Sequence, residues 1–106
     1  MSKYYNEDGT KNRDVYSWIP WNEPDLQWNG LGDNFCQAYK NAYDAVKEFD
    51  PGERVQGPEC SWYESGKMKN FLLYCKENNC LPDVLSWHEL TPSKMSIAAH
   101  CRELYL

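Results

Sequence analysis

The residues with the clearest capacity for chemistry are Asn22 and Glu23, which follow a short aromatic run at residues 15–19 and precede Pro24. A carboxylate at the carboxyl end of a parallel strand lies on the face where such folds bind ligands. The Asn22 amide can donate to a ligand hydroxyl or to the glutamate itself. Burial beside indole rings favours the protonated form of a carboxyl group, which suits a general acid. The residues alone leave two roles open for Glu23, a catalytic acid or a solvated loop carboxylate.

Other side chains with binding potential also follow the expected strands. His88 ends an aromatic run and is either a residue of a binding pocket or a loop histidine. Glu59 and Glu89 follow expected strand ends, but no motif surrounds them, and we expect both to be rim or surface carboxylates. Aromatic rings pack well on the apolar faces of sugar rings. The tryptophans that could do so, with core packing as their alternative role, are Trp21, Trp62 and Trp87; for Trp18, inside the expected strand, core packing is favoured.

The cysteines do not form a recognisable metal or disulfide pattern. None of the five belongs to a CxxC pair, so we expect no metal site. Cys75 and Cys80 could form a disulfide in an oxidising compartment, whereas buried free thiols are the alternative that we favour. No motif for a metal or an organic cofactor is present, and we expect none.

The charge balance excludes several classes of partner. Sixteen acidic and eleven basic residues give a net charge of −5, which argues against binding to nucleic acid or to anionic membranes. No apolar run is long enough to cross a bilayer. The first fifteen residues lack the apolar segment of a signal peptide, so the sequence gives no localisation. We expect a soluble protein with a neutral ligand.

The elements that would position these residues alternate between strand and helix. After residues 15–19, apolar side chains recur at helical spacing until Asp50, Pro51 and Gly52 stop the helix. Residues 54–57 then form a short strand that breaks at Pro58. The apolar positions of the first helix are Phe35, Tyr39, Ala42, Val46 and Phe49.

A second helix is predicted at residues 67–78, followed by a third strand at residues 83–87. The second helix has Ser65 as its N-cap, Asn78 and Asn79 as its end, and Met68, Phe71, Leu72 and Cys75 as its apolar side. Thr91 caps a last helix, which Pro92 opens and which continues through Arg102.

The spacing of the strands limits the possible architectures. Expected strand starts near residues 15, 53 and 83 give units of 30 to 38 residues. An eight-stranded βα barrel uses about 31 residues per unit. Because no hairpin signal separates the strands, we predict parallel strands with right-handed crossovers. The fold class is therefore α/β with about three parallel βα units, either a small domain or a part of a TIM barrel, at residues 14–106 after a polar segment at residues 1–13.

The order of the motifs resembles one enzyme family. Trp21-Asn22-Glu23-Pro24-Asp25 after an aromatic strand is similar to the fourth-strand signature of clan-A retaining glycoside hydrolases, of the family 39 type that includes β-xylosidases and α-L-iduronidases. The resemblance continues through residues 54–58 and residues 83–88, which are similar to strands five and six of that barrel. It implies a fragment that covers strands four to six of a partial (β/α)8 TIM barrel, over about residues 14–104.

The resemblance also implies roles for individual residues. Glu23 matches the general acid/base of the family, Asn22 the residue that contacts a substrate hydroxyl, and His88 a residue of the substrate pocket. Trp21 and Trp87 would contact the substrate, an oligo- or polysaccharide. The nucleophilic glutamate of the family follows a seventh strand, which we do not find, so we expect the isolated chain to be inactive. The alternatives are a non-catalytic carbohydrate-binding or remnant barrel fragment, and self-association through exposed strand edges.

Overall fold

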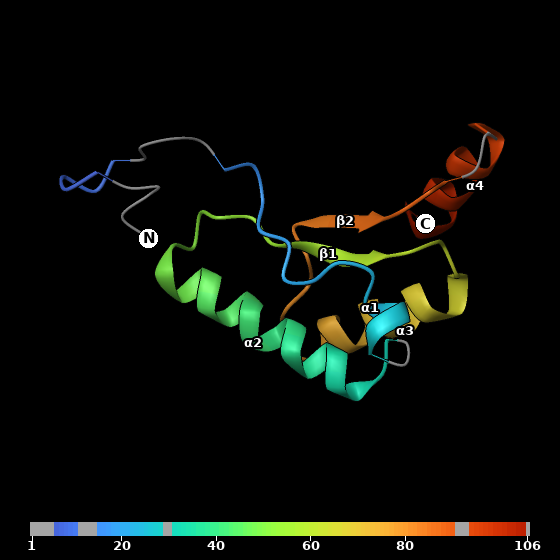
Figure 1. Cartoon of the computed structure of the whole chain (residues 1–106), viewed down its shortest axis with the longest axis horizontal. Coiled ribbons are helices and arrows are strands. Elements are labelled where there is room, and N and C mark those ends of the chain that lie inside the picture. Colours follow the sequence, from blue (N-terminus) through green and yellow to red (C-terminus); the bar gives the residue numbers. More distant parts are fainter. Residues whose placement is uncertain (1–5, 11–14, 29–30, 91–93, 106) are drawn as a thin grey trace.

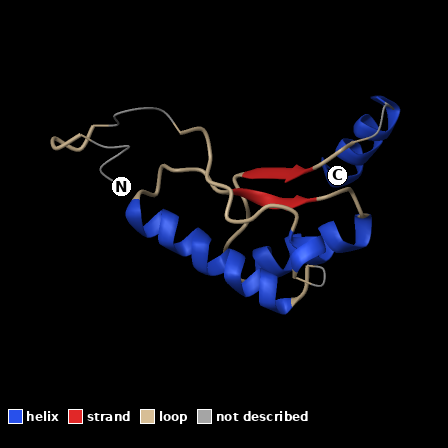
Figure 2. Cartoon of the chain, viewed as in Figure 1, coloured by secondary structure: helices blue, strands red, loops and turns tan. Residues whose placement is uncertain are grey.

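The computed structural model describes residues 6–10, 15–28, 31–90 and 94–105. In chain order the elements are α1 (Pro24–Gln27), α2 (Asp33–Phe49), β1 (Gln56–Cys60), α3 (Ser65–Glu77), β2 (Val84–Trp87) and α4 (Lys94–Tyr105). Figure 1 shows α1, α2 and α3 on one side of the strands and α4 beyond their carboxyl ends. The result is a mixed α/β arrangement, as the alternation of apolar patterns predicts (Figure 2).

The sheet of the described residues consists of β1 and β2, which run parallel. Its ladder pairs Gln56 with Val84 and Gly57 with Leu85, and α3 supplies the crossover between the strands. The predicted parallel pairing is therefore confirmed for these two strands. The predicted strand break at Pro58 is wrong, because β1 continues through that residue to Cys60.

The first predicted strand, at residues 15–19, is reduced to one parallel bridge between Trp18 and Val55. The Trp18 N–H donates to the Arg54 carbonyl at 2.8 Å, and the Trp18 carbonyl accepts from the Gln56 N–H at 2.8 Å. Bridging hydrogen bonds at a single residue do not make a strand. The segment nevertheless lies parallel to β1, in the position that the first strand of three βα units would take.

The core lies between α2, α3 and the sheet. Its buried residues include Phe35 and Tyr39 of α2, Phe71 and Cys75 of α3, and Val55 before β1. The periodicity of both helices therefore predicts their buried faces correctly, except that Phe49 at the end of α2 is 48% exposed.

Glycine is required at position 57 of β1 because a Cβ atom there would lie 2.7 Å from Cε2 of Tyr39. The Tyr39 ring thus packs directly on the backbone of the strand. It also meets the Phe71 ring edge-on at 5.0 Å between centroids. Rings at this separation and angle attract each other beyond the area that they bury, so Tyr39 joins the sheet to both helices.

The helix ends show which local signals are reliable. Ser65 is the first residue of α3, and Glu64 takes the N-cap position, so the predicted cap is wrong. The predicted end is confirmed, because Asn79 adopts a left-handed backbone with φ of 56° and the Cys80 N–H donates to the Cys75 carbonyl at 2.8 Å. This pairing is the usual way in which a helix satisfies its last carbonyls. The predicted cap and start of the last helix, Thr91 and Pro92, lie outside the described residues.

The cysteines of the structure are free thiols, in agreement with the favoured prediction. Cys36, Cys60, Cys75 and Cys80 are buried, and Cys101 on α4 is exposed. Among the residues that the structure describes, no helix is long and apolar enough to cross a membrane.

Candidate functional site

Three ionisable side chains from different parts of the chain meet at the carboxyl ends of the strands. Glu23 precedes α1, Glu59 lies in β1, and His88 directly follows β2. The Glu23 N–H donates to the Glu59 carbonyl at 2.9 Å, and the His88 N–H donates to the Cys60 carbonyl at 2.8 Å. Backbone hydrogen bonds thus fix the distances between all three segments.

The closest contact in this group joins Glu23 and His88. Their Oε1 and Nδ1 atoms lie 3.0 Å apart, and their side chains are 29% and 26% exposed. Two side chains separated by 65 residues therefore form a direct hydrogen bond that remains open to a ligand. The arrangement can hold a proton at the Glu23 carboxyl and present it to a bound molecule.

Glu59 faces the other nitrogen of the imidazole. Its Oε1 lies 3.4 Å from His88 Nε2, and its side chain is only 14% exposed. The second oxygen accepts from Gln56 Nε2 at 3.1 Å and from the Ser86 hydroxyl. The expectation that Glu59 is a rim or surface carboxylate is therefore wrong: it lies inside β1 and is held by both strands.

Glu89 forms a second pair beside the first. Its Oε2 accepts from the Trp87 indole at 2.8 Å and lies 2.8 Å from Nδ1 of His100 on α4. The Tyr63 ring stacks on His100 at 4.0 Å between centroids. The hydrogen bonds from His100 and Trp87 lower the pKa of the Glu89 carboxyl, so this carboxylate stays charged over a wide pH range.

A cavity of about 380 Å³ adjoins His88 of the first pair and is lined by both members of the second pair, Glu89 and His100; Glu23 does not line it. Its walls include His88 and Glu89, together with Trp62, whose side chain is 66% exposed. The complete lining is Ser61, Trp62, Tyr63, His88, Glu89, Leu90 and His100. An open cavity with aromatic walls and several polar groups is the usual form of a small-molecule site.

The remaining predicted site residues lie around Glu23. Asn22 and Trp21 are both exposed, and Trp21 meets Trp28 edge-on at 5.6 Å. Trp87 is partly buried, with its indole N–H held by Glu89 and its ring against Tyr63 at 5.3 Å. The structure therefore brings Glu23 and His88 into contact, leaves Asn22 and Trp21 accessible, and gives Trp87 a packing partner.

Helix α1 holds Glu23 in place. Pro24 is its first residue and is buried, and Asp25 accepts hydrogen bonds from the Ser61 N–H at 2.9 Å and the Ser61 hydroxyl at 2.6 Å. These bonds join α1 to the segment that follows β1. Glu23 itself has a left-handed backbone with φ of 50°, which turns the chain sharply between the bridge at Trp18 and the helix.

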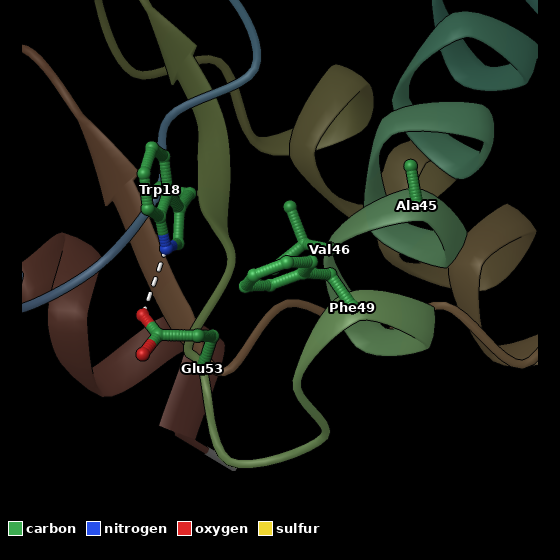
Figure 3. A pocket seen from close by; sticks show the side chains of 5 residues that line it. All are labelled: Trp18, Ala45, Val46, Phe49 and Glu53. Carbon is green, nitrogen blue, oxygen red and sulfur yellow. Dashed lines mark hydrogen bonds between the residues drawn. The ribbon is translucent and has the colours of Figure 1, made fainter. Parts of the chain in front are cut away.

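A second cavity lies elsewhere, between α2 and the segment that carries Trp18 (Figure 3). It measures about 330 Å³ and is lined by Trp18, Ala45, Val46, Phe49 and Glu53. The Trp18 indole donates to Glu53 at 2.8 Å, so the polar groups in this cavity already bind each other. Trp18 is partly buried, faces α2 across this cavity and does not belong to the core cluster, so the structure does not bear out its predicted core role.

Among the described residues, no group of three or more His, Cys, Asp or Glu side chains could hold a metal ion. The chemistry that the site offers is proton transfer between carboxyl groups and imidazole.

Sequence reasoning assigned Glu59 to the rim of the site and missed His100, the partner of Glu89. No local motif marks either residue. For His100, the helical spacing of the last segment gives its register but not its neighbour. For Glu59, only its position near a strand end was available, and that position did not reveal the burial.

Comparison with known proteins indicates the class of enzyme to which the chain is similar, the glycoside hydrolases. Over an alignment 112 positions long, the chain is 33% identical to 3-O-beta-L-arabinopyranosyl-alpha-L-arabinofuranosidase of Bifidobacterium pseudocatenulatum. Over an alignment 108 positions long, it is 29% identical to 3-O-alpha-D-galactosyl-alpha-L-arabinofuranosidase of Bifidobacterium longum subsp. longum. The alignments include 82% and 76% of the chain but only 12% and 10% of these proteins. No family model matches.

A solved structure supports the fold over most of the chain. The protein N2152 from Neocallimastix frontalis is 42% identical and superimposes with a TM-score of 0.76. The match covers 88% of the chain and 23% of that protein. The chain therefore spans a small part of each relative, and the arrangement of its elements recurs within a larger protein.

Proposed function

We propose that this chain carries the acid/base half of a glycoside hydrolase active site, with Glu23 as the proton donor and acceptor. The observation that carries the proposal is the 3.0 Å contact between Glu23 Oε1 and His88 Nδ1 beside an open cavity. The similarity to two named arabinofuranosidases supports the same class of chemistry.

The proposed reaction is a retaining double displacement within a family 39-like (β/α)8 barrel, of which this chain would form strands four to six. In the first step the Glu23 carboxyl gives its proton to the glycosidic oxygen while the bond to the anomeric carbon breaks. A nucleophilic carboxylate from outside this chain forms the glycosyl ester. In the second step ionised Glu23 takes a proton from water, whose oxygen attacks the anomeric carbon and releases the carboxylate.

The neighbouring side chains would bind the sugar. Asn22 is exposed beside Glu23 and can donate to a substrate hydroxyl, while Trp21 offers an exposed ring. His88 and Trp87 would line the site from the end of β2. The substrate would be an oligo- or polysaccharide, and the names of the relatives make arabinofuranosides the first compounds to test.

The test is Glu23→Gln in the full-length protein, assayed on aryl α-L-arabinofuranosides with good and poor leaving groups. General acid catalysis contributes about 10²–10⁴-fold, so we expect a loss of that size with a poor leaving group. The loss should be smaller with an activated one, which needs no proton. Azide should restore turnover of the activated substrate by forming the glycosyl azide, because azide attacks without a general base.

Glu48→Gln on α2 is the matched control, since it removes the same charge from an exposed position. Wild-type rates for Glu23→Gln on poor leaving groups would refute the acid/base role. If the wild-type protein instead binds the glycosides without cleaving them, the non-catalytic carbohydrate-binding function would replace the proposed one.

A further inference from the structure

The imidazole of His88 lies between two carboxylates, and each faces a different ring nitrogen. Nδ1 is 3.0 Å from Glu23 Oε1, and Nε2 is 3.4 Å from Glu59 Oε1. A ring nitrogen that carries a proton is attracted to a carboxylate, whereas a bare nitrogen directs its lone pair at the negative charge. Which ring nitrogen of His88 carries the proton therefore depends on which of the two carboxyl groups accepts a hydrogen bond from the ring.

Of the two carboxylates, Glu59 is held more firmly in place by hydrogen bonds. Its Oε2 accepts from Gln56 Nε2 and from the Ser86 hydroxyl, so β1 and β2 each contribute a donor. These two donors hold the Glu59 carboxyl in place from both strands. By comparison, Glu23 is twice as exposed as Glu59, with 29% against 14% of the side chain accessible.

An irregularity in the backbone of β1 directs the Glu59 side chain towards His88. The register with β2 shifts between Pro58 and Cys60, and Glu59 between them has a φ of 64°. In a regular strand residues three apart point to opposite faces, but at this bulge Gln56 and Glu59 bond to each other. A left-handed backbone is strained for a residue other than glycine and persists where the surroundings impose it. Bulges often redirect a side chain beside an active site.

We propose that Glu59 is a positioning residue that keeps Nε2 of His88 protonated, so that Nδ1 is left bare and accepts a hydrogen bond from the Glu23 carboxyl. This inference rests on the proposed acid/base role of Glu23 and adds a member to that site. A buried carboxylate selects the tautomer of an adjacent imidazole in the same way in hydrolase triads.

The arrangement serves both steps of the proposed reaction. With Nε2 protonated, a neutral ring presents a bare Nδ1 that accepts a hydrogen bond from the protonated Glu23 carboxyl. After Glu23 has given its proton to the leaving oxygen, the bare Nδ1 faces a carboxylate. This repulsion favours the return of a proton to Glu23, which is the general-base step. Proton balance holds, since Glu59 and Nε2–H do not change.

The direct test is the protonation of each ring nitrogen in the uniformly ¹⁵N-labelled chain, measured by long-range ¹H–¹⁵N correlation at neutral pH. The sequence has two histidines, and the structure predicts different patterns for them. His88 should show a protonated Nε2. His100 should show a protonated Nδ1, because among the described residues a carboxylate, that of Glu89 at 2.8 Å, faces only this nitrogen of its ring. A bare Nε2 in wild-type His88 would overturn the proposal without any variant.

Glu59→Gln supplies the second arm. The amide has nearly the same shape but no charge, and its N–H can donate to a bare Nε2, so His88 should change to the form protonated on Nδ1. An Nε2 that stays protonated in this variant would also overturn the proposal. His100 is the internal control for folding and should not change. Glu89→Gln is the matched variant, and it should alter the signals of His100 but leave those of His88 in place.

These outcomes are separate from the test of the proposed function. If the Glu23→Gln assay refuted the acid/base role of Glu23, the measured tautomer of His88 would still hold. Conversely, a bare Nε2 would remove Glu59 from its proposed role and leave the hydrolase proposal to stand on the kinetics of Glu23→Gln.

Discussion

At the scale of single residues, the candidate site contains two of the three non-glycine residues with a left-handed backbone in the described chain, Glu23 and Glu59. The third, Asn79, ends a helix, where this conformation is common. For a glutamate the same conformation is strained. Both glutamates contact His88, so the strain coincides with a place where ionisable groups from three separate segments meet.

The Tyr39 hydroxyl gives a first prediction at this scale. Tyr39 is 1% exposed, and its hydroxyl oxygen is buried without a hydrogen-bond partner in the described structure. Burial also raises the pKa of Tyr39 far above its usual range. An unpaired buried hydroxyl costs free energy, whereas the ring carries the packing. We expect Tyr39→Phe to keep or raise the free energy of unfolding, by up to about 1 kcal/mol, as measured by urea denaturation.

Tyr39→Leu is the matched comparison, because it removes the ring that lies against Gly57 and Phe71. It should lower the free energy of unfolding by about 2–4 kcal/mol, as large core truncations do. A clear destabilisation by Tyr39→Phe would show that the hydroxyl has a partner that the structure does not contain.

The cysteines give a second prediction. Thiolates are the reactive form, and burial raises the pKa of Cys36 to about 11 and that of Cys60 to about 12. Burial likewise raises the pKa values of Cys75 and Cys80. Cys101 is exposed. Ellman's reagent should therefore titrate one thiol rapidly in the native chain and all five after denaturation.

Cys101→Ser is the control, and it should remove the rapid phase without changing the slow one. If a thiol still reacted rapidly in this variant, it would be a core thiol, and the core would then open on the timescale of the reaction.

At the scale of elements, α4 is attached to the rest of the chain through polar contacts. Glu103 accepts hydrogen bonds from Ser65, from Lys69 at 2.9 Å and from the Tyr63 hydroxyl at 2.9 Å. The bonds from Ser65, Lys69 and Tyr63 lower the pKa of Glu103 from 4.5 to about 2. The same helix supplies His100 to Glu89, so the position of α4 shapes one wall of the candidate cavity.

This pKa fixes the direction of a pH effect. Because the carboxyl pKa is lower in the folded chain, the ionised group stabilises the docked helix fully above pH 4.5, and the contribution is lost as the pH falls towards about 2. Amide protection factors in Lys94–Tyr105 should decrease over that interval. Glu103→Gln should lower them at neutral pH and flatten their pH dependence, while Glu77→Gln, at an exposed position of α3, should do neither. Equal pH curves for wild type and Glu103→Gln would contradict this attachment.

The elements differ in how far the sequence predicts them. The apolar periodicity of α2 and α3 gives their buried faces, because a helix repeats its facing residues every three to four positions. The strands are harder: β1 continues through Pro58, and the segment at Trp18 forms only a bridge. Whether an extended segment becomes a strand depends on partners on both sides, which the local sequence does not contain.

The sequence predicts one contact of the site but not the other. Glu23 and His88 each follow an extended segment, and parallel strands end at the same edge of a sheet, so their proximity follows from the fold class. Glu59 becomes a partner of His88 only through the bulge in β1. No residue pattern in that segment announces a bulge, and the burial of Glu59 depends on Gln56 and on Ser86, which lies 27 residues away.

At the scale of the whole molecule, the described chain is less compact than a closed domain. Its radius of gyration is 15.2 Å, against about 13 Å for a globular domain of this length. The sheet leaves the outer edges of β2 and of the Trp18 segment without a strand partner in the described residues. Unpaired edges and exposed apolar side chains are surfaces that other chain segments usually cover.

These edges lead to a prediction for the isolated chain: it should self-associate. Ile19 is 48% exposed and adjoins Trp18 at the outer edge, where a lysine would oppose strand pairing by its charge. Light scattering after size exclusion should show a mass that rises with concentration for the wild type and less steeply for Ile19→Lys. Tyr105→Lys is the matched control, because Tyr105 is 90% exposed at the end of α4, a helix that lies beyond the carboxyl ends of the strands in Figure 1. A mass of 12.5 kDa at every concentration would show that the edges are protected. An equal effect of both variants would show that the association depends on net charge instead of strand pairing.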